Sequence, residues 1–239
     1  HPRVRRQRQM CIRDRNYGSR KEVKEYIRKG YFMVNGETIY KDDFKVSPLD
    51  DEITFDGGVI EYNEFVYIML NKPKDVISAT FDPRYKTVID LMPEYAKMSV
   101  FPVGRLDIDT EGLLIITNDG ALAHRLLSPK YHVWKKYYLT FDGIYKEEYQ
   151  HNFEEGIILD DGYKTLLARF EIIKENEAYI YIHEGKYHQV KRMLEALNMK
   201  VTYLKRVGFG DITLDNTLNL GQYRLLTKEE IDILKGNSK

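Results

Sequence analysis

The stretch GRLDIDTEGLLIITNDGALAHRLLSP, residues 104–129, says most about the fold of this chain. Gly104 and Gly112 enclose a polar loop, and the apolar run at 113–117 predicts a buried β-strand directly behind it. A helix is expected at 120–127. The charged residues of the loop are Arg105, Asp107, Asp109 and Glu111. A loop with this much charge ahead of a buried strand is a candidate site for chemistry.

Three interpretations of the loop are open. Its acids can be solvated turn residues with no chemical role, which is common for a single short motif. They can bind a metal, because the spacing comes near the Asp-x-Asp-x-Thr pattern of aspartyl phosphatases. Against this, Thr110 stands one place early and Phe101-Pro102 makes a poor preceding strand. Third, one carboxylate can be a catalytic group. The second interpretation is the weakest, so no metal is expected.

Two further segments carry candidate residues. KKYYLT (135–140) reads as a strand in which Tyr137 and Tyr138 face opposite sides, so one ring is a core residue or stacks on a base. EGKYHQVKRM (184–193) reads as the start of a basic helix. His188 in this segment has no Ser or Cys placed for it to activate, so nucleophilic hydrolysis is not expected.

The rest of the region from residue 65 onward predicts an α+β fold with a mixed, mostly antiparallel sheet, because strands outnumber helices and rarely alternate with them. The expected catalytic domain covers 65–235. Strands are expected at 65–70, 113–117, 136–142, 168–173, 178–183, 200–206 and 211–214. Helices are expected at 86–92, 120–127, 145–153, 187–197 and 228–235.

The front of the chain has a different pattern. Residues 1–15, HPRVRRQRQMCIRDR, are expected to be a non-native or disordered basic tail. Ser19-x-x-Glu22 is a capping box, and Gly30 ends the helix that it begins. Asn35-Gly36 joins two β-prone runs and predicts a hairpin. A strand is expected at 52–55, and a linker from Gly57 to Glu64.

The segment SRKEVKEYIRKGYFMVNG (19–36) resembles the S4-type RNA-binding domain. The resemblance implies a small RNA-binding module over 16–58, truncated at its start because residues 1–15 do not supply the usual first helix. The phosphate-facing cations that it implies are Arg20, Lys21, Lys24, Arg28 and Lys29.

The segment 104–129 resembles the signature of the RsuA-type pseudouridine synthases. YIMLNKPKDVISA (67–79), HVWKKYYLT (132–140), EGKYHQVKRM (184–193) and LGQYRLLTKEEI (220–231) resemble the family's other motifs. Trp134 stands where the family commonly has Pro, and a local packing change is expected there. The resemblance covers about 16–231 and implies the pseudouridine synthase fold.

The resemblance also implies the roles of residues. Asp107 is the catalytic carboxylate, Tyr137 is the ring that stacks on the flipped base, and Lys191 pairs with Asp107. A neighbouring cation, Lys191 or Arg105, favours the charged form of the carboxylate. The reaction detaches uracil at N1 and rejoins it at C5. Because this is an isomerisation, no cofactor is expected.

The overall charge argues mildly against a nucleic-acid partner, but its distribution along the chain suggests a basic binding module at the front. The formal net charge is zero, but residues 1–47 hold a net charge of +7 and the remainder −7, and six of the front cations lie within 1–15. Cys11 is the single cysteine, so neither an internal disulfide nor a zinc framework is expected. With no secretory signal or membrane-spanning run expected, a cytoplasmic monomer is the prediction.

The expected partner is ribosomal RNA of the small subunit (16S) or an assembly intermediate of that subunit. A large-subunit (23S) rRNA pseudouridine synthase is one alternative. A non-catalytic S4-type RNA-binding protein is another, and it predicts that Asp107 or Tyr137 is lost; both are present.

Overall fold

A computed structural model describes residues 19–44, 46, 51–60 and 65–236. The chain divides into two compact units, residues 1–65 and 66–239. Residues 1–15, where the tail is expected, lie outside the described residues. In the described part of the chain, we find no helix with the length and apolar character needed to cross a membrane.

The described part of the first unit begins with α2 (Arg20–Arg28), and the predicted capping box is confirmed. In the capping box, Ser19 N donates to the Glu22 carboxylate, and Glu22 N donates to Ser19 Oγ. The predicted hairpin is also confirmed: β1 (Phe32–Val34) and β2 (Glu37–Thr38) pair antiparallel, and both turn residues have positive φ, 50° at Asn35 and 82° at Gly36. Positive φ at both positions is what this turn demands.

Two further strands complete the sheet of the first unit. β3 (Ile53–Phe55) confirms the strand expected at 52–55. The linker expected from Gly57 is wrong at its start, because Gly58–Ile60 forms β4 and pairs antiparallel with β3. The strand order is β2-β1-β3-β4. A small core lies between this sheet and α2; it consists of Val23, Ile27, Phe32, Ile53 and Ile60.

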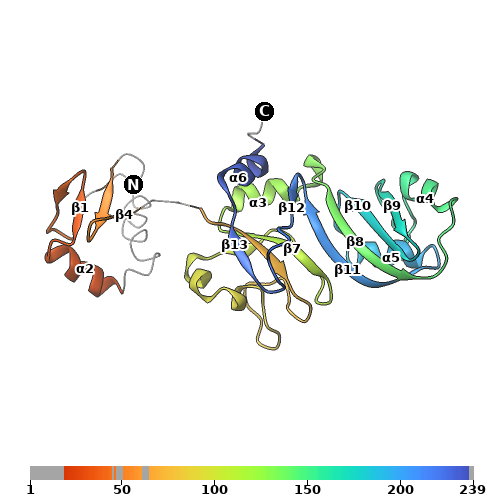
Figure 1. The fold of residues 1–239 in the computed structure, drawn as a ribbon, viewed down its shortest axis with the longest axis horizontal. Coiled ribbons are helices and arrows are strands. Elements are labelled where there is room, and N and C mark those ends of the chain that lie inside the picture. The colour runs from red at the N-terminus through yellow and green to blue at the C-terminus, as the bar shows by residue number, and fades with distance from the viewer. Residues whose placement is uncertain (1–18, 45, 47–50, 61–64, 237–239) are drawn as a thin grey trace. The chain divides into compact units, whose positions relative to one another are not determined.

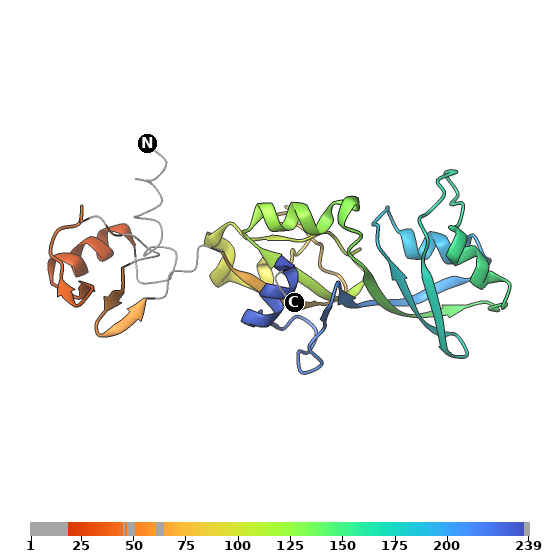
Figure 2. The same cartoon turned by 90° about the horizontal axis from the view of Figure 1, so that it is seen from above.

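The second unit is built on a nine-stranded sheet (Figure 1, Figure 2). The main path is β13-β5-β7-β11-β8-β10-β9, with β6 added on β7 and β12 on β11. The strands are β5 (Tyr67–Lys72), β6 (Phe101–Pro102), β7 (Glu111–Thr117), β8 (Lys135–Asp142), β9 (Arg169–Lys174), β10 (Glu177–Ile182), β11 (Lys200–Phe209), β12 (Ile212–Thr213) and β13 (Tyr223–Leu225). Among the described strands β7 and β11 pair parallel and the other named pairs are antiparallel, which confirms the mixed, mostly antiparallel sheet.

Helices cover different parts of this sheet (Figure 1). α3 and α6 lie together near β12 and β7, whereas α4 lies against β9 and α5 against β11. The helices are α3 (Gly120–Leu127), α4 (Tyr149–Glu155), α5 (Gln189–Glu195) and α6 (Lys228–Lys235), with 3-10 turns η1 (Ile89–Leu91), η2 (Pro93–Met98) and η3 (Pro129–Tyr131).

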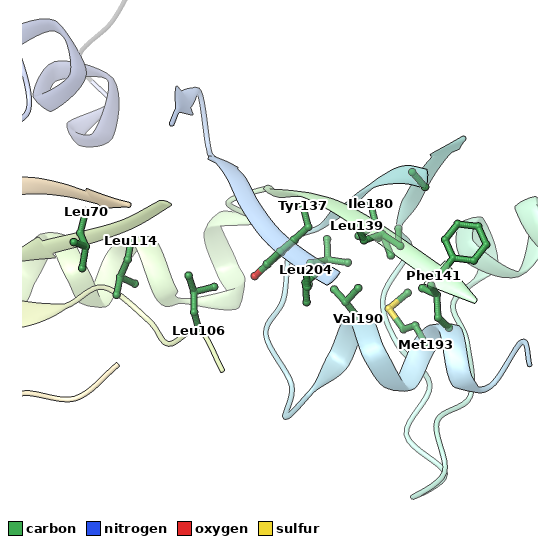
Figure 3. Packing of buried hydrophobic residues seen from close by; sticks show 14 of the residues in the cluster. Leu70, Leu106, Leu114, Tyr137, Leu139, Phe141, Ile180, Val190, Met193 and Leu204 are labelled. Atoms are coloured by element: carbon green, nitrogen blue, oxygen red, sulfur yellow. The ribbon is translucent and has the colours of Figure 1, made fainter. Parts of the chain in front are cut away.

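β7 is buried on both faces, as its uninterrupted apolar run predicts. Leu113 and Ile115 pack into a core with α3, while Leu114 and Ile116 pack into a second core that extends to α5. Figure 3 shows Val190 of α5 directed toward the side chains of the strands above it. The loop before β7 therefore joins a strand that is fixed from both sides.

Four expectations about secondary structure need correction. The helix expected at 86–92 is only the turn η1, because Thr87 instead forms a bridge with Ile77 and Pro93 follows closely. The helix expected at 145–153 begins later, at Tyr149. Phe101–Pro102 does form a short strand, and Tyr223–Leu225 forms a strand that was not expected.

Candidate active site

The polar loop of residues 105–110 is held from below by a buried lysine. Lys72 ends β5 and is 0% exposed. Its Nζ donates to the carbonyl oxygens of Asp107 at 3.1 Å, Thr110 at 2.9 Å and Pro73 at 3.0 Å, with Ile108 O at 3.4 Å. One ammonium group thus binds carbonyls from both ends of the loop that carries Asp107.

The charge of Lys72 is destabilised by this burial. Loss of water lowers its pKa from 10.5 to about 8, and the nearby carboxylates, first of all Asp107, oppose that shift. A buried amine retains its proton at neutral pH only where acceptors replace water. The four carbonyls provide that replacement, so the loop and the lysine stabilise each other.

A serine and two backbone hydrogen bonds hold the same loop from the side. Ser78 Oγ accepts from Leu106 N and donates to Leu106 O, both at 2.9 Å. Ile108 O accepts from Asp75 N at 2.8 Å, and Asp107 O accepts from Thr110 N at 3.1 Å. The backbone on each side of Asp107 is therefore tied to the segment that follows β5.

The glycine at the end of the loop is required by the strand beside it. Gly112 has φ +104°, and a Cβ there would lie 2.1 Å from the carbonyl oxygen of Arg206 on β11. Arg206 is 2% exposed and donates through Nε to Leu113 O at 2.7 Å. A side chain at position 112 would push β7 and β11 apart and move the loop.

A lysine and a histidine from the α5 segment lie near the carboxylate of Asp107. The Asp107 side chain is 31% exposed. Lys191 Nζ lies 3.6 Å from Oδ2, and His188 Nε2 lies 3.8 Å from Oδ1. Both distances exceed the usual length of a hydrogen bond. Asp107 is thus a partly open carboxylate with two basic neighbours and a free approach from solvent.

Asp109 takes the direct hydrogen bonds of Lys191. Lys191 Nζ lies 2.6 Å from Asp109 Oδ1 and 2.8 Å from Oδ2. Burial raises the pKa of Asp109, but the hydrogen bond and charge of Lys191 outweigh this effect and leave that pKa below its ordinary value. The structure therefore brings Lys191 to Asp107, as the sequence implies, but shares it with a second carboxylate.

Arg105, the other cation considered for Asp107, is exposed. Within the residues that the structure describes, it forms no ion pair. Of the two cations considered for Asp107, Lys191 lies within ion-pair distance and Arg105 does not.

Tyr137 and Tyr138 face opposite sides of β8, as the alternation predicts. Tyr137 is 7% exposed and belongs to the same core as Leu106, the residue before Asp107. In Figure 3 its hydroxyl end points to the side on which Leu106 lies. Tyr138 lies on the other face, where its hydroxyl donates to Glu177 and that bond raises the pKa of Tyr138. Tyr137 is the tyrosine on the Asp107 side.

His188 has a strained backbone and an exposed neighbour. Its φ is 48°, in the left-handed region, directly before α5. The ring of Tyr187, 76% exposed, stacks on the His188 ring with centroids 3.8 Å apart. Strained residues of this kind cluster at functional sites.

Sequence reasoning missed Lys72 and Ser78 and gave no role to His188. The available signal for Lys72 was its position at the end of the apolar run YIMLNK. A lysine at the end of a buried strand needs hydrogen-bond acceptors that replace water.

The cations expected to face phosphate in the first unit are placed on or next to α2. Lys21 is exposed. Lys24 and Arg28 both reach Asp42, at 3.0 and 3.5 Å, and Lys29 pairs with Glu25 at 2.8 Å. Nothing is described of the Arg20 side chain. Three of these cations therefore already have a carboxylate neighbour, at exposed positions where such pairs are weak.

The class of enzyme to which this sheet and loop belong is identified by comparison with known proteins. The RNA pseudouridylate synthase family profile matches residues 66–196. This chain belongs to the RNA pseudouridine synthase family.

Individual relatives agree. The chain is 47% identical over 224 residues to a Bacillus subtilis protein named uncharacterized RNA pseudouridine synthase YtzG, covering 91% of this chain and 93% of that one. It is 41% identical to ribosomal small subunit pseudouridine synthase A of Vibrio parahaemolyticus, covering 90% and 93%. A crystal structure of a pseudouridylate synthase matches with a TM-score of 0.68 at 35% identity, covering 95% of this chain and 98% of the other.

Proposed function

We propose that this pseudouridine synthase isomerises a uridine of small-subunit ribosomal RNA and that Asp107 is its catalytic carboxylate. The observation that carries the proposal is the setting of Asp107: a half-buried carboxylate on a loop tied by Lys72 and Ser78, with Lys191 3.6 Å away. The choice of small-subunit RNA is supported by relatives that bear that name.

The chemistry needs a carboxylate in this setting. The bond between C1′ and N1 breaks, the uracil turns, a bond between C1′ and C5 forms, and the hydrogen of C5 leaves as a proton while N1 gains one. Asp107 acts in its ionised form, either as nucleophile at the sugar or as base at the ribose. Lys191, whose Nζ lies 3.6 Å from Oδ2, is placed to orient the carboxylate.

The uridine must leave its stack before it reaches Asp107. Flipping a base costs a few kcal/mol, and stacking on an aromatic ring returns about 1–3 kcal/mol. Tyr137 is the ring that we assign to this role. Tyr137 is 7% exposed and belongs to the same core as Leu106, so in this proposal the base stacks on a ring that is largely covered in the free protein.

The first unit, in this proposal, is an S4-type module that contacts the same RNA. Lys21, Lys24, Arg28 and Lys29 are the cations on or next to α2 that would face phosphate, together with Arg20. Binding would exchange the carboxylate partners Asp42 and Glu25 for phosphate oxygens. This exchange predicts salt-sensitive RNA binding. We further propose that the enzyme works as a monomer in the cytoplasm, which light scattering and cell fractionation would test.

The proposal is tested by tritium release from small-subunit rRNA labelled with ³H at C5 of uridine. We expect release by wild type and by Asp211→Asn, a control carboxylate on the β11–β12 turn, but not by Asp107→Asn, which should still bind RNA. Substantial turnover by Asp107→Asn would refute the catalytic assignment. Release from large-subunit rRNA alone would refute the substrate assignment.

A further inference from the structure

Two of the most exposed aromatic rings of the second unit lie in one short loop. We call residues 78–86, which follow Ile77, the aromatic loop. Phe81 in this loop is 80% exposed and Tyr85 is 55% exposed. Single exposed apolar side chains are ordinary, but two large exposed rings within five residues of one loop are a candidate contact surface.

The aromatic loop is held in a defined shape. Its two ends are joined by the bridge between Ile77 and Thr87, with Ile77 N donating to Lys86 O at 2.9 Å. At the tip, Asp82 Oδ1 accepts from Arg84 N at 2.8 Å and from Tyr85 N at 3.0 Å. Because the backbone of the loop is already fixed, it loses little further conformational entropy when the rings bind a partner.

The aromatic loop starts at a residue that is hydrogen-bonded to the polar loop of residues 105–110. Ser78, its first residue, exchanges two hydrogen bonds with the backbone of Leu106, next to Asp107. Arg84 is exposed and, among the described residues, forms no ion pair. The loop that is anchored through Ser78 to the backbone next to Asp107 thus carries two exposed rings and an exposed guanidinium.

We infer that the aromatic loop binds RNA by stacking Phe81 and Tyr85 on nucleotides that flank the target uridine. This inference rests on the proposed function. A flipped uridine leaves its neighbours without a stacking partner, and aromatic rings accept any base because every base has a π-face. Arg84 adds a charge that suits phosphate, which favours RNA over an apolar protein partner.

The test compares Phe81→Ala, Tyr85→Ala and the double variant with wild type. KM and kcat come from tritium release with labelled small-subunit rRNA, and Kd comes from fluorescence anisotropy with an end-labelled transcript of the same rRNA. Loss of one stacked base corresponds to about 5- to 150-fold in affinity. We expect each single variant to raise KM and Kd at least 5-fold, the double variant to raise them further, and kcat at saturating RNA to stay within 2-fold.

Two control variants sharpen the test. Phe81→Trp keeps a stacking ring and should bind like wild type. Ile144→Ala removes a side chain that is 79% exposed, beyond the end of β8 where Asp142 pairs with Lys200, and should change nothing. Equal melting temperatures would show that all variants are folded.

Wild-type KM and Kd in the double variant would overturn the inference and leave the two rings to a protein partner. A fall in kcat with unchanged Kd would also overturn it, because the aromatic loop would then only support Asp107. Absence of tritium release by wild type would refute the proposed function instead, while the Kd comparison still decides whether the aromatic loop binds RNA.

Discussion

Replacing Lys72 by Met tests how the loop around Asp107 is held. The Met side chain fills a similar volume but donates no hydrogen bond, so four carbonyls lose a donor. The carbonyl of Asp107 still accepts from Thr110 N, and that of Ile108 still accepts from Asp75 N. At most two of the four carbonyls therefore lose every hydrogen-bond donor. Each buried group without a partner costs about 1–3 kcal/mol.

The net effect should be smaller than the upper limit of about 6 kcal/mol that follows from two such groups. Burial of the ammonium is itself unfavourable, as the pKa of about 8 for Lys72 indicates, and the substitution relieves it. We expect the free energy of unfolding to fall by about 2–4 kcal/mol, which corresponds to roughly 5–15 °C in Tm for a unit of this size. Turnover should fall by about 100-fold or more, because the carboxylate is displaced.

Urea unfolding and tritium release measure the two effects, with Lys74→Met as the control at an exposed position two residues away. A change in unfolding free energy below 0.5 kcal/mol, on the order of a neutral surface substitution, with full turnover would refute the role of Lys72.

The same pair of proteins gives a pH test. Between pH 8 and about 10.5 the unfolded chain keeps a proton on Lys72 that the folded chain has lost, so the contribution of this residue to stability rises with pH in that window. The difference in unfolding free energy, wild type minus Lys72→Met, should therefore grow from pH 8 to pH 10, and a constant difference would contradict the assigned pKa.

Three substitutions test the surroundings of Asp107. Gly112→Ala should prevent stable folding of the second unit, seen as loss of the cooperative thermal transition, because its Cβ would lie 2.1 Å from a carbonyl oxygen of β11; Gly120→Ala, where the added atom meets open space, should fold normally. Lys191→Ala should reduce turnover about 100-fold through lost orientation of Asp107, and Asp109→Asn should reduce it less, because its amide oxygen still accepts from Lys191. The reverse order would mean that Lys191 serves Asp109 as the reactive carboxylate.

The central strands could be predicted because their local pattern is strong. The inner part of β7, residues 113–116, is an uninterrupted apolar run, and α2 has both halves of a capping box, so these elements needed no tertiary information. β13 could not be predicted, because Tyr223–Leu225 becomes a strand only by pairing with β5, some 150 residues earlier in the chain. The helix expected at 86–92 failed for a similar reason, since a long-range bridge takes Thr87.

The candidate site divides in the same way. Asp107, Tyr137 and Lys191 are recognisable because their segments are distinctive, and the structure places Lys191 within 3.6 Å of Asp107. The sharing of Lys191 with Asp109 and the support from Lys72 depend on which atoms meet across 82 and 35 positions of sequence. Sequence spacing does not carry such geometry.

The parallel contact between β7 and β11 has a consequence for how the enzyme is made. Arg206 packs against Gly112 at the end of the polar loop that carries Asp107, so that loop cannot reach its final form until the ribosome has released β11. Until then β7, buried on both faces in the finished molecule, has an unpaired edge and uncovered side chains. Such long-range strand pairing folds slowly and is open to aggregation. During synthesis the loop and β7 should therefore remain unfinished until the chain has been released beyond residue 209.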